Sequence, residues 1–412
     1  MTFNNKGTIA HHNVWNTVFA YAQRYPNMYS ALVLPIAILG YACLLFFPFM
    51  LLAGTAEIIQ LVSNTPISQM SDHIGSIVFW LGVMAVCAFT TFDIISIKFQ
   101  PLEGIDVTPA IASNLHQLIE KSALQVDIPK IDRIIITEQL SIDIAKTPAF
   151  PLPVWSTNTL VVGLPLMQCL SPEYFECAVT RKLIQYSKNT HTVSKWLYQM
   201  RNTWAMYAKY FSSPDHNNFF LSAFFGIYAP VYRHVSVPVA NHVELLADQD
   251  TLAIINDEDL LQTIEKVIVT KIYLEKQYWP KIQNLVSRNL YRHIEPYSRL
   301  EQALEKGLTP KLSKQWLDSL YCSHSTKVFP TPDLRSRMNN IGRSRIRIPE
   351  KTTETAAHYY LDNAYRDIIS EVNQLWLVRS NHQYASTLKP GKHKCPSPLN
   401  APTSSISSEL FN

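Results

Sequence analysis

The sequence predicts an α+β protein in which an N-terminal hairpin of two transmembrane helices precedes a mainly helical domain with a small β-sheet. Two long apolar segments lie near the N-terminus, and 47% of the 412 residues are hydrophobic whereas only 17% are charged. A chain of this length can bury a full-sized core and still have apolar sequence left over. Downstream of the two segments, apolar residues recur mainly at helical spacing, and short β-type runs interrupt them.

Each of the two apolar segments is long enough to cross a bilayer. The first, 31–53, contains no charged residue, and the second, 75–97, contains only Asp93, close to its end. The first segment begins too late and is too long for the apolar part of a cleaved signal peptide. The alternative, two buried core helices of a soluble domain, is disfavoured by their length and lack of charge.

The distribution of positive charge predicts the orientation of this hairpin, which we assign to residues 29–98. No Lys or Arg occurs between Arg24 and Lys98, whereas the connecting loop contains acidic residues. The positive-inside rule therefore places residues 1–28 and everything beyond the hairpin in the cytoplasm. We expect a multi-pass protein of a bacterial-type inner membrane, with the lipid bilayer as a partner.

The composition turns globular beyond the hairpin and predicts one domain over residues 99–380. A helix is expected over 102–124, where apolar residues recur at helical spacing. Short β-type runs follow at 132–137, 141–145 and 159–163, separated by polar or proline-rich linkers. The pattern indicates a helix followed by a small sheet.

A further helix is predicted to open at Ser171, because this N-cap residue is followed by a proline and then by an acidic residue. We expect it to run to about Lys188. Amphipathic helices are predicted over 252–277 and 281–320. The tail 381–412, rich in Ser, Pro and Lys, is expected to be disordered.

Several protein classes are disfavoured by composition and by missing motifs. The net charge is only +4, with Lys and Arg scattered along the chain, so nucleic acid is not an expected partner. Six cysteines at irregular spacing predict neither a zinc ribbon nor a disulfide scaffold, which fits a reducing compartment. Glycine-rich phosphate loops and the nucleophile elbow of hydrolases are absent from the sequence.

Four stretches, together with the hairpin, carry a resemblance to a known family. They are LVVGLPLMQCLSPEYFECAVTRKLIQYSK (160–188), FFLSAFFGIYAP before RHVSVPVANHVELLADQDTL (219–252), TPDLRSRMNNIGRS (331–344) and TAAHYYLDNAYRDIISEVNQLW (355–376). In this order and spacing they resemble the membrane-anchored zincin metallopeptidases, or gluzincins, related to the bacterial heat-shock protease HtpX and the CAAX prenyl protease. The resemblance covers residues 29–379 and implies a zincin-like peptidase domain.

The helix that in this family carries the H-E-x-x-H motif has different residues here. Such a helix sets two imidazoles one turn apart on zinc, while the glutamate takes a proton from zinc-bound water. The resemblance aligns the zinc-ligand positions with Arg181 and Gln185 and the general-base position with Lys182. A guanidinium has no lone pair to donate, and an amide oxygen is a weak ligand. We therefore expect the catalytic zinc site to be lost.

Two acidic residues match the family motif that supplies the third zinc ligand. The resemblance implies that Glu244 is the one retained ligand position. It also implies that Asp248 would orient the ligands without binding the metal itself. The family's histidine before proline is replaced by Thr331. An active zinc-dependent metalloendopeptidase with a remodelled metal site remains the alternative, with His234 and His242 near Glu244 as candidate new ligands.

The favoured hypothesis is a catalytically inactive pseudopeptidase that acts in binding or scaffolding at the membrane. Membrane or unfolded protein segments are the expected protein partners, no cofactor is expected unless the alternative holds, and the oligomeric state is left open. Loss of zinc would leave Glu244 as a buried carboxylate without a counter-charge, which is costly. We therefore predict a replacement salt bridge from Arg181, or failing that from Lys182.

Two simpler interpretations of this helix compete with that prediction. R-K-x-x-Q is also ordinary for a helix face in contact with water, in which case Arg181 would point to solvent. One turn earlier, Cys177 is a candidate nucleophile whose pKa a neighbouring cation would lower. A buried and inert helix cysteine is the commoner case.

Overall fold

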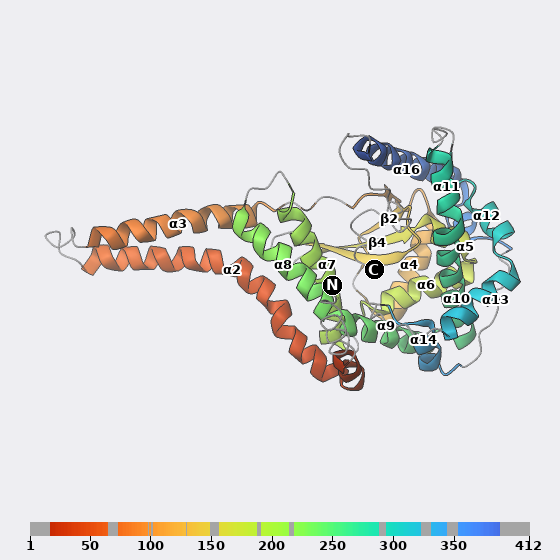
Figure 1. Cartoon of the computed structure of the whole chain (residues 1–412), viewed down its shortest axis with the longest axis horizontal. Coiled ribbons are helices and arrows are strands. Elements are labelled where there is room, and N and C mark those ends of the chain that lie inside the picture. The colour runs from red at the N-terminus through yellow and green to blue at the C-terminus, as the bar shows by residue number, and fades with distance from the viewer. Residues whose placement is uncertain are drawn as a thin grey trace, which may run out of the picture.

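A long helical hairpin projects from a rounded, mainly helical body in the computed structural model (Figure 1). The structure describes residues 17–64, 73–97, 99, 102–128, 130–148, 156–187, 191–213, 218–287, 294–322, 331–343 and 353–387. The elements in chain order are α2 (Pro26–Asn64), α3 (Ile74–Ile95), β1 (Ile105–Asp106), α4 (Ser113–Val126), β2 (Arg133–Thr137), β3 (Ile142–Pro148), β4 (Ser156–Gly163), α5 (Leu164–Cys169), α6 (Pro172–Ile184), α7 (Thr192–Phe211), α8 (Phe219–Val235), α9 (Val237–Leu252), α10 (Asp257–Tyr273), the π-helical turn η2 (Leu274–Tyr278), α11 (Trp279–Ser287), α12 (Leu300–Gly307), α13 (Pro310–Cys322), α14 (Leu334–Ile341), α15 (Ala356–Leu361), the 3-10 turn η4 (Asp362–Ala364) and α16 (Tyr365–Thr387).

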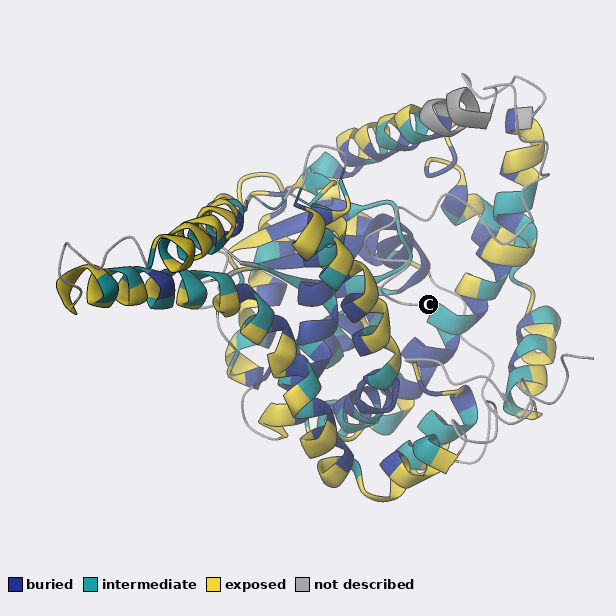
Figure 2. Cartoon of the chain, turned by 60° about the vertical axis from the view of Figure 1, so that its left-hand side comes forward, coloured by how far each residue is buried: buried dark blue, intermediate teal, exposed yellow. Residues whose placement is uncertain are grey.

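The hairpin consists of α2 and α3, which lie side by side and are both long and apolar enough to cross a membrane. Only 17% and 22% of their most apolar stretches are buried within the molecule, whereas the core helices of a soluble protein are mostly buried. Figure 2 shows the corresponding exposed surface along the projecting part. The α2 helix extends beyond the predicted span 31–53 at both ends, and its N-terminal half packs against the body.

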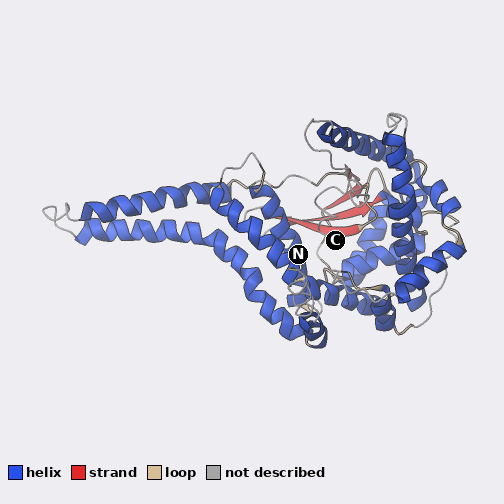
Figure 3. Cartoon of the chain, viewed as in Figure 1, coloured by secondary structure: helices blue, strands red, loops and turns tan. Residues whose placement is uncertain are grey.

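A four-stranded mixed sheet lies in the body, with helices on several sides of it (Figure 3). The strand order is β1-β2-β4-β3, in which β2 and β4 are parallel and the other pairs are antiparallel. Three of the strands were predicted, but β1 lies within the helix predicted over 102–124, and α4 begins only at Ser113. Gly104, at φ 153°, explains the difference, since this backbone conformation is incompatible with a helix.

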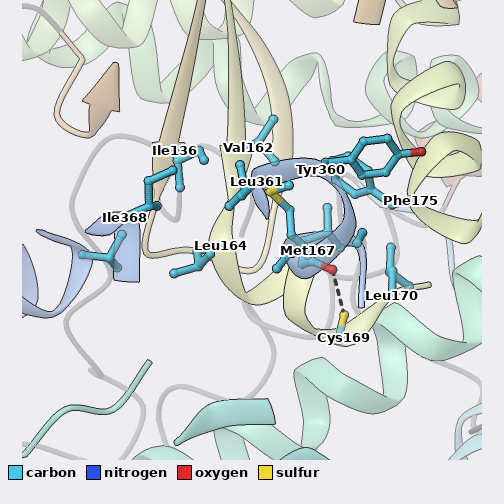
Figure 4. Close-up of a cluster of buried hydrophobic side chains, with 14 of the residues drawn as sticks. Ile136, Val162, Leu164, Met167, Cys169, Leu170, Phe175, Tyr360, Leu361 and Ile368 are labelled. Atoms are coloured by element: carbon cyan, nitrogen blue, oxygen red, sulfur yellow. Dashed lines mark hydrogen bonds between the residues drawn. The ribbon is translucent and has the colours of Figure 1, made fainter. Parts of the chain in front are cut away.

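The first hydrophobic core joins the sheet to α4, α5, α6, α15 and α16. Figure 4 shows Ile136 and Val162 of the sheet close to Leu361 and Ile368, which come from the C-terminal helices. All four side chains are almost fully buried. This core holds α6 firmly against the sheet, and α6 is the helix that carries the R-K-x-x-Q segment.

A second core, which is rich in aromatic residues, attaches the hairpin to the body. The N-terminal half of α2 packs against α7 and α8 around Trp204, Tyr207 and Phe225, all of which are fully buried. Gly40 of α2 permits this close approach, because a Cβ atom there would lie 2.7 Å from the Trp204 ring. The hairpin is therefore part of the folded unit and not a loosely tethered anchor.

The C-terminal boundary of the domain differs from the prediction. The α16 helix continues to Thr387, past the start of the tail predicted at 381. No proline or glycine occurs between Tyr365, where α16 begins, and Pro390, so nothing in the sequence ends the helix at the predicted boundary. Residues 388–412, the rest of the predicted disordered tail, lie outside the described residues.

Candidate functional site

The residues at the N-terminus of α6 determine where this helix begins. The Ser171 hydroxyl accepts a hydrogen bond from the Tyr174 backbone amide at 3.5 Å, Pro172 occupies the first turn, and Glu173 follows it. The helix ends at Ile184, earlier than the predicted end near residue 188. The basic residues 181 and 182 therefore lie in its last turn, where positive charges interact favourably with the negative end of the helix dipole.

Helix α9 brings two carboxylates to the face of α6. Glu244 and Asp248 are one turn apart, so their side chains project from the same side of α9. Both are buried, Asp248 completely. Because α6 packs directly on α9, these carboxylates face the last turn of α6.

The R-K-x-x-Q face is buried, so its interpretation as a water-facing helix surface is wrong. Arg181 retains only 14% side-chain exposure, Lys182 is buried, and Gln185 is completely buried. Neither polar atom of the Gln185 side chain makes a hydrogen bond within the described part of the chain. A buried cation requires a partner, and the structure supplies one to each of the two cations.

Arg181 contacts both carboxylates of α9. Its Nη2 atom donates to Oε2 of Glu244 at 2.7 Å, and its Nε atom donates to Oδ1 of Asp248 at 2.6 Å. The Nη2 atom also lies 3.3 Å from the backbone oxygen of Glu244. The pairing of Arg181 with Glu244 expected from the sequence is thus present, and Asp248 shares the same guanidinium.

A second arginine completes the environment of Asp248. From α14, Arg337 donates through Nε to Oδ2 and through Nη2 to Oδ1 of Asp248, both at 2.8 Å. Such a bidentate arginine–carboxylate pair is among the strongest ion pairs in proteins. The neighbouring Asn340 donates to the Leu245 backbone oxygen at 2.7 Å and holds α14 against α9. Arg337 lies in the stretch 331–344 that carries the family resemblance, but the sequence alone predicted no role for it.

Lys182, at the family's general-base position, pairs with a residue that the sequence did not single out. Its Nζ atom lies 2.9 Å from Oδ1 of Asp143 on β3 and 3.5 Å from the Tyr198 hydroxyl of α7. The Tyr186 hydroxyl donates to the same Asp143 oxygen at 3.2 Å, and the Tyr198 hydroxyl donates to Glu244 at 3.4 Å. The polar contacts therefore run without a break from β3 to α9.

The buried charges in this network balance. Three cations, Arg181, Lys182 and Arg337, face three carboxylates, Asp143, Glu244 and Asp248, and each carboxylate has a cationic nitrogen within 2.9 Å. Burial of single charges would be strongly unfavourable, but a fully paired and hydrogen-bonded set can be accommodated. A divalent metal ion bound at Glu244 would instead lie among three positive charges.

The pKa values follow from this arrangement. Burial alone would raise the pKa of Glu244, but the charges of Arg181 and Lys182 and the hydrogen bond from Arg181 together lower it to about 2. The pKa of Asp248 is also lowered, by Arg181 and Arg337, against the opposing effect of burial. Burial disfavours the charged form of Lys182, yet Asp143 holds the pKa of that amine above its ordinary value. Lys182 is therefore a cation at neutral pH and cannot accept a proton from water.

The other residues that the sequence suggested as functional do not belong to this ion-pair network. Thr331 is exposed in the segment before α14. His234 is exposed, and His242 is two residues from Glu244 on α9, a spacing that points the two side chains in different directions. The His242 ring instead contacts the His191 ring, with centroids 5.8 Å apart. Over the described ranges, no group of three His, Cys, Asp or Glu side chains has a metal-binding arrangement.

Cys177 is an unsuitable nucleophile. The side chain is buried in a core between α6, α10 and α14. Burial raises the pKa of its thiol to about 11, and the smaller effect of the Arg181 charge does not offset that rise. The expectation that the neighbouring cation would lower this pKa is therefore wrong, because loss of hydration outweighs the charge.

Comparison with known proteins gives no further assignment: no protein-family model, curated protein or solved structure matches the chain.

Proposed function

We propose that this protein is a catalytically inactive, membrane-anchored pseudopeptidase whose cytoplasmic domain acts in binding or scaffolding at a bacterial-type inner membrane. The zincin resemblance of the sequence supports the peptidase origin of the domain. The observation that carries the loss of activity is the ion-pair network between α6 and α9, in which Arg181 contacts both Glu244 and Asp248. In this proposal a guanidinium ties together the two helices that zinc would join in an active relative.

The chemistry of the side chains argues against hydrolysis by this network. Zinc ligands must offer lone pairs, and Arg181 has none. Activation of water needs a group that accepts a proton near neutral pH, whereas Lys182 stays protonated beside Asp143. Both oxygens of Asp248 accept hydrogen bonds from arginines, so that carboxylate is not available as a base.

The membrane part of the proposal places α2 and α3 across the bilayer with both ends in the cytoplasm. Two helices of suitable length and apolarity, with no Lys or Arg between Arg24 and Lys98, support this orientation. A topology reporter fused after Leu124 should be active only in its cytoplasmic form. A periplasmic signal from that fusion would contradict the orientation.

Metal analysis of the purified full-length protein, combined with a protease assay, tests the loss of activity. We expect no stoichiometric zinc and no chelator-sensitive cleavage of casein or of unfolded membrane proteins. The matched control is the triple variant Arg181→His, Lys182→Glu and Gln185→His, which restores the family motif beside the existing Glu244. If the geometry is that of a zincin, this variant should acquire zinc.

The results for the natural chain and for the triple variant test two separate parts of the proposal, the loss of activity and the zincin origin of the site. Stoichiometric zinc with chelator-sensitive cleavage by the natural chain would establish the alternative, an active enzyme with a remodelled metal site. A triple variant that folds but binds no zinc would contradict the zincin origin of the site. Membrane proteins and unfolded protein segments are the partner classes to test for binding by the natural chain.

A further inference from the structure

The outward face of α8 is apolar along its length. Phe219, Phe220, Ile227 and Val231 are 76%, 57%, 72% and 50% exposed. No charged residue occurs between the start of α8 and Arg233. A helix on the water-exposed surface of a soluble domain normally presents charged or polar residues on this side. The exposed face of α8 is therefore suited to an apolar environment.

The N-terminal half of α2 extends the same surface. Leu32, Ile38 and Leu39 are 63%, 49% and 51% exposed, although the opposite side of the helix packs in the aromatic core with α7 and α8. The Tyr228 hydroxyl of α8 donates to the Ile36 backbone oxygen of α2 at 2.7 Å, so the two helices lie in direct contact. We call their combined exposed apolar side chains the α2–α8 face; they are Met28, Leu32, Ile38, Leu39, Phe219, Phe220, Ile227 and Val231.

Two hydrogen bonds place the ends of this face relative to the hairpin. At one end, the Asn218 amide donates to Asp93 at 2.8 Å, next to the C-terminus of α3. At the other end, the Tyr29 hydroxyl donates to the Val235 backbone oxygen at 2.9 Å. The α2–α8 face thus begins where α3 leaves the hairpin and runs back to the start of α2.

The segment just before α2 has the residues expected at a membrane–water boundary. Tyr21 and Tyr25 are exposed, and the exposed Arg24 lies between them in the chain. Tyrosine and arginine are enriched at this level of a bilayer, because their apolar portions contact lipid while their polar ends remain hydrated. This end of the face therefore favours contact with lipid headgroups.

The dimensions of the hairpin indicate where the bilayer lies. The 22 residues of α3 span about 33 Å, enough to cross the hydrocarbon core of about 30 Å. The 39 residues of α2 span about 58 Å, so only the half beside α3 is needed for the crossing. Figure 1 shows α2 bending as it leaves α3 and then running beside α8.

We propose that the α2–α8 face lies in the cytoplasmic surface of the bilayer that the hairpin crosses, at the boundary between headgroups and acyl chains. The occupant is lipid, because the face continues directly from the spanning half of the same helix and meets it without an intervening charged residue. This inference rests on the membrane anchoring proposed above and is independent of the loss of the zinc site.

Contact between α8 and lipid would also position the ion-pair network. Helix α9, which contains Glu244 and Asp248, follows α8 after the single residue Ser236. The Arg201 guanidinium holds this junction, since Nη1 donates to the Arg233 backbone oxygen and to the Ser236 hydroxyl, both at 2.7 Å. A fixed contact of α8 with the bilayer therefore sets the height of α9 above the membrane.

Spin-label accessibility in the full-length protein tests the proposal. The protein is reconstituted in vesicles of phosphatidylethanolamine and phosphatidylglycerol, with a nitroxide on p-acetylphenylalanine introduced at Ile227 or, separately, at Phe219. This amino acid is labelled through its ketone, so the native cysteines remain. Collisions with oxygen, which concentrates in lipid, are compared with collisions with a water-soluble nickel chelate. The matched control is Leu124 on α4, an apolar residue that is 84% exposed outside this face.

We expect a ratio of oxygen to nickel accessibility that is several-fold higher at both α8 positions than at Leu124. A nickel-accessible label on α8 would overturn the proposal, since the face would then be in water. Low accessibility to both reagents would also overturn it and would indicate a covering protein, such as a second copy of this chain. A label at Val78 of α3 reports insertion of the hairpin itself, so failure of membrane anchoring is distinguished from failure at α8 alone.

Discussion

The ion-pair network between α6, α9 and α14 and the apolar surface of α2, α3 and α8 depart in opposite ways from the usual pattern of a soluble protein. The network has three cations and three carboxylates in the interior, whereas the surface exposes large apolar side chains such as Phe92 at 68% and Ile227 at 72%. The buried charges are compensated within the chain. The exposed apolar residues are not, which is why they indicate the surroundings of the protein.

This comparison predicts that substitutions in the two regions will have different effects. A substitution in the network should affect the stability of the isolated protein, because it leaves a charge buried without a partner. A substitution on the apolar surface should act mainly through the proposed contact with the membrane.

The largest effect is expected for Asp248→Asn, which removes the carboxylate that Arg337 contacts and leaves Arg181 with Glu244 alone. We expect a loss of about 3–5 kcal/mol in the free energy of unfolding, measured by denaturation in a mild detergent. The matched control is Asp106→Asn, whose carboxylate lies 2.7 Å from Arg133 in a pair with both side chains 47% exposed. That change should cost less than about 1 kcal/mol. Equal costs for the two variants would show that burial of the network has no energetic consequence.

A smaller loss, on the order of 3 kcal/mol, is expected for Arg181→Ala, because Asp248 retains Arg337 whereas Glu244 loses its closest partner. Combining this change with Glu244→Gln should recover much of the loss, since the stranded carboxylate is then removed. Additive losses in this double-mutant cycle would rule out direct coupling. Lys121→Ala serves as the control, because it breaks a 2.8 Å pair with Glu176 in which the lysine is 69% exposed. Its cost should be about 0–1 kcal/mol.

Acid should weaken the network gradually. The pKa of Glu244 falls from 4.5 to about 2 on folding, so its contribution is fully present above pH 4.5 and is lost as the pH falls toward 2. Linkage gives a loss of about 2 kcal/mol by pH 3 from this group, and Asp248 acts in the same direction. Unfolding free energies between pH 6 and pH 3 measure the effect. The double variant Arg181→Ala, Glu244→Gln should show a shallower decline, and an unchanged slope would mean that other carboxylates dominate the acid sensitivity.

The candidate site was predictable in part from the sequence. The resemblance singled out Arg181, Glu244 and Asp248, and a buried carboxylate without its metal suggested a cationic partner. The pairing of Lys182 with Asp143 was not foreseen, because a single aspartate between two isoleucines on a strand is equally consistent with a solvent-facing position.

The sequence by itself determined the features that depend on neighbouring residues. These include the two apolar helices, which need only a continuous run without charge, and the start of α6, where the hydroxyl of Ser171 lies within one turn of the amide that it accepts from. The tertiary structure decided whether the R-K-x-x-Q face is buried and which charges meet there. Those contacts join residues 67 and 89 positions apart, such as Arg181 and Arg337 with Asp248, and only the packing of α6, α9 and α14 brings them within hydrogen-bonding distance. Pairing of buried charges depends on distance in space, and the local pattern of a helix contains no information about that distance.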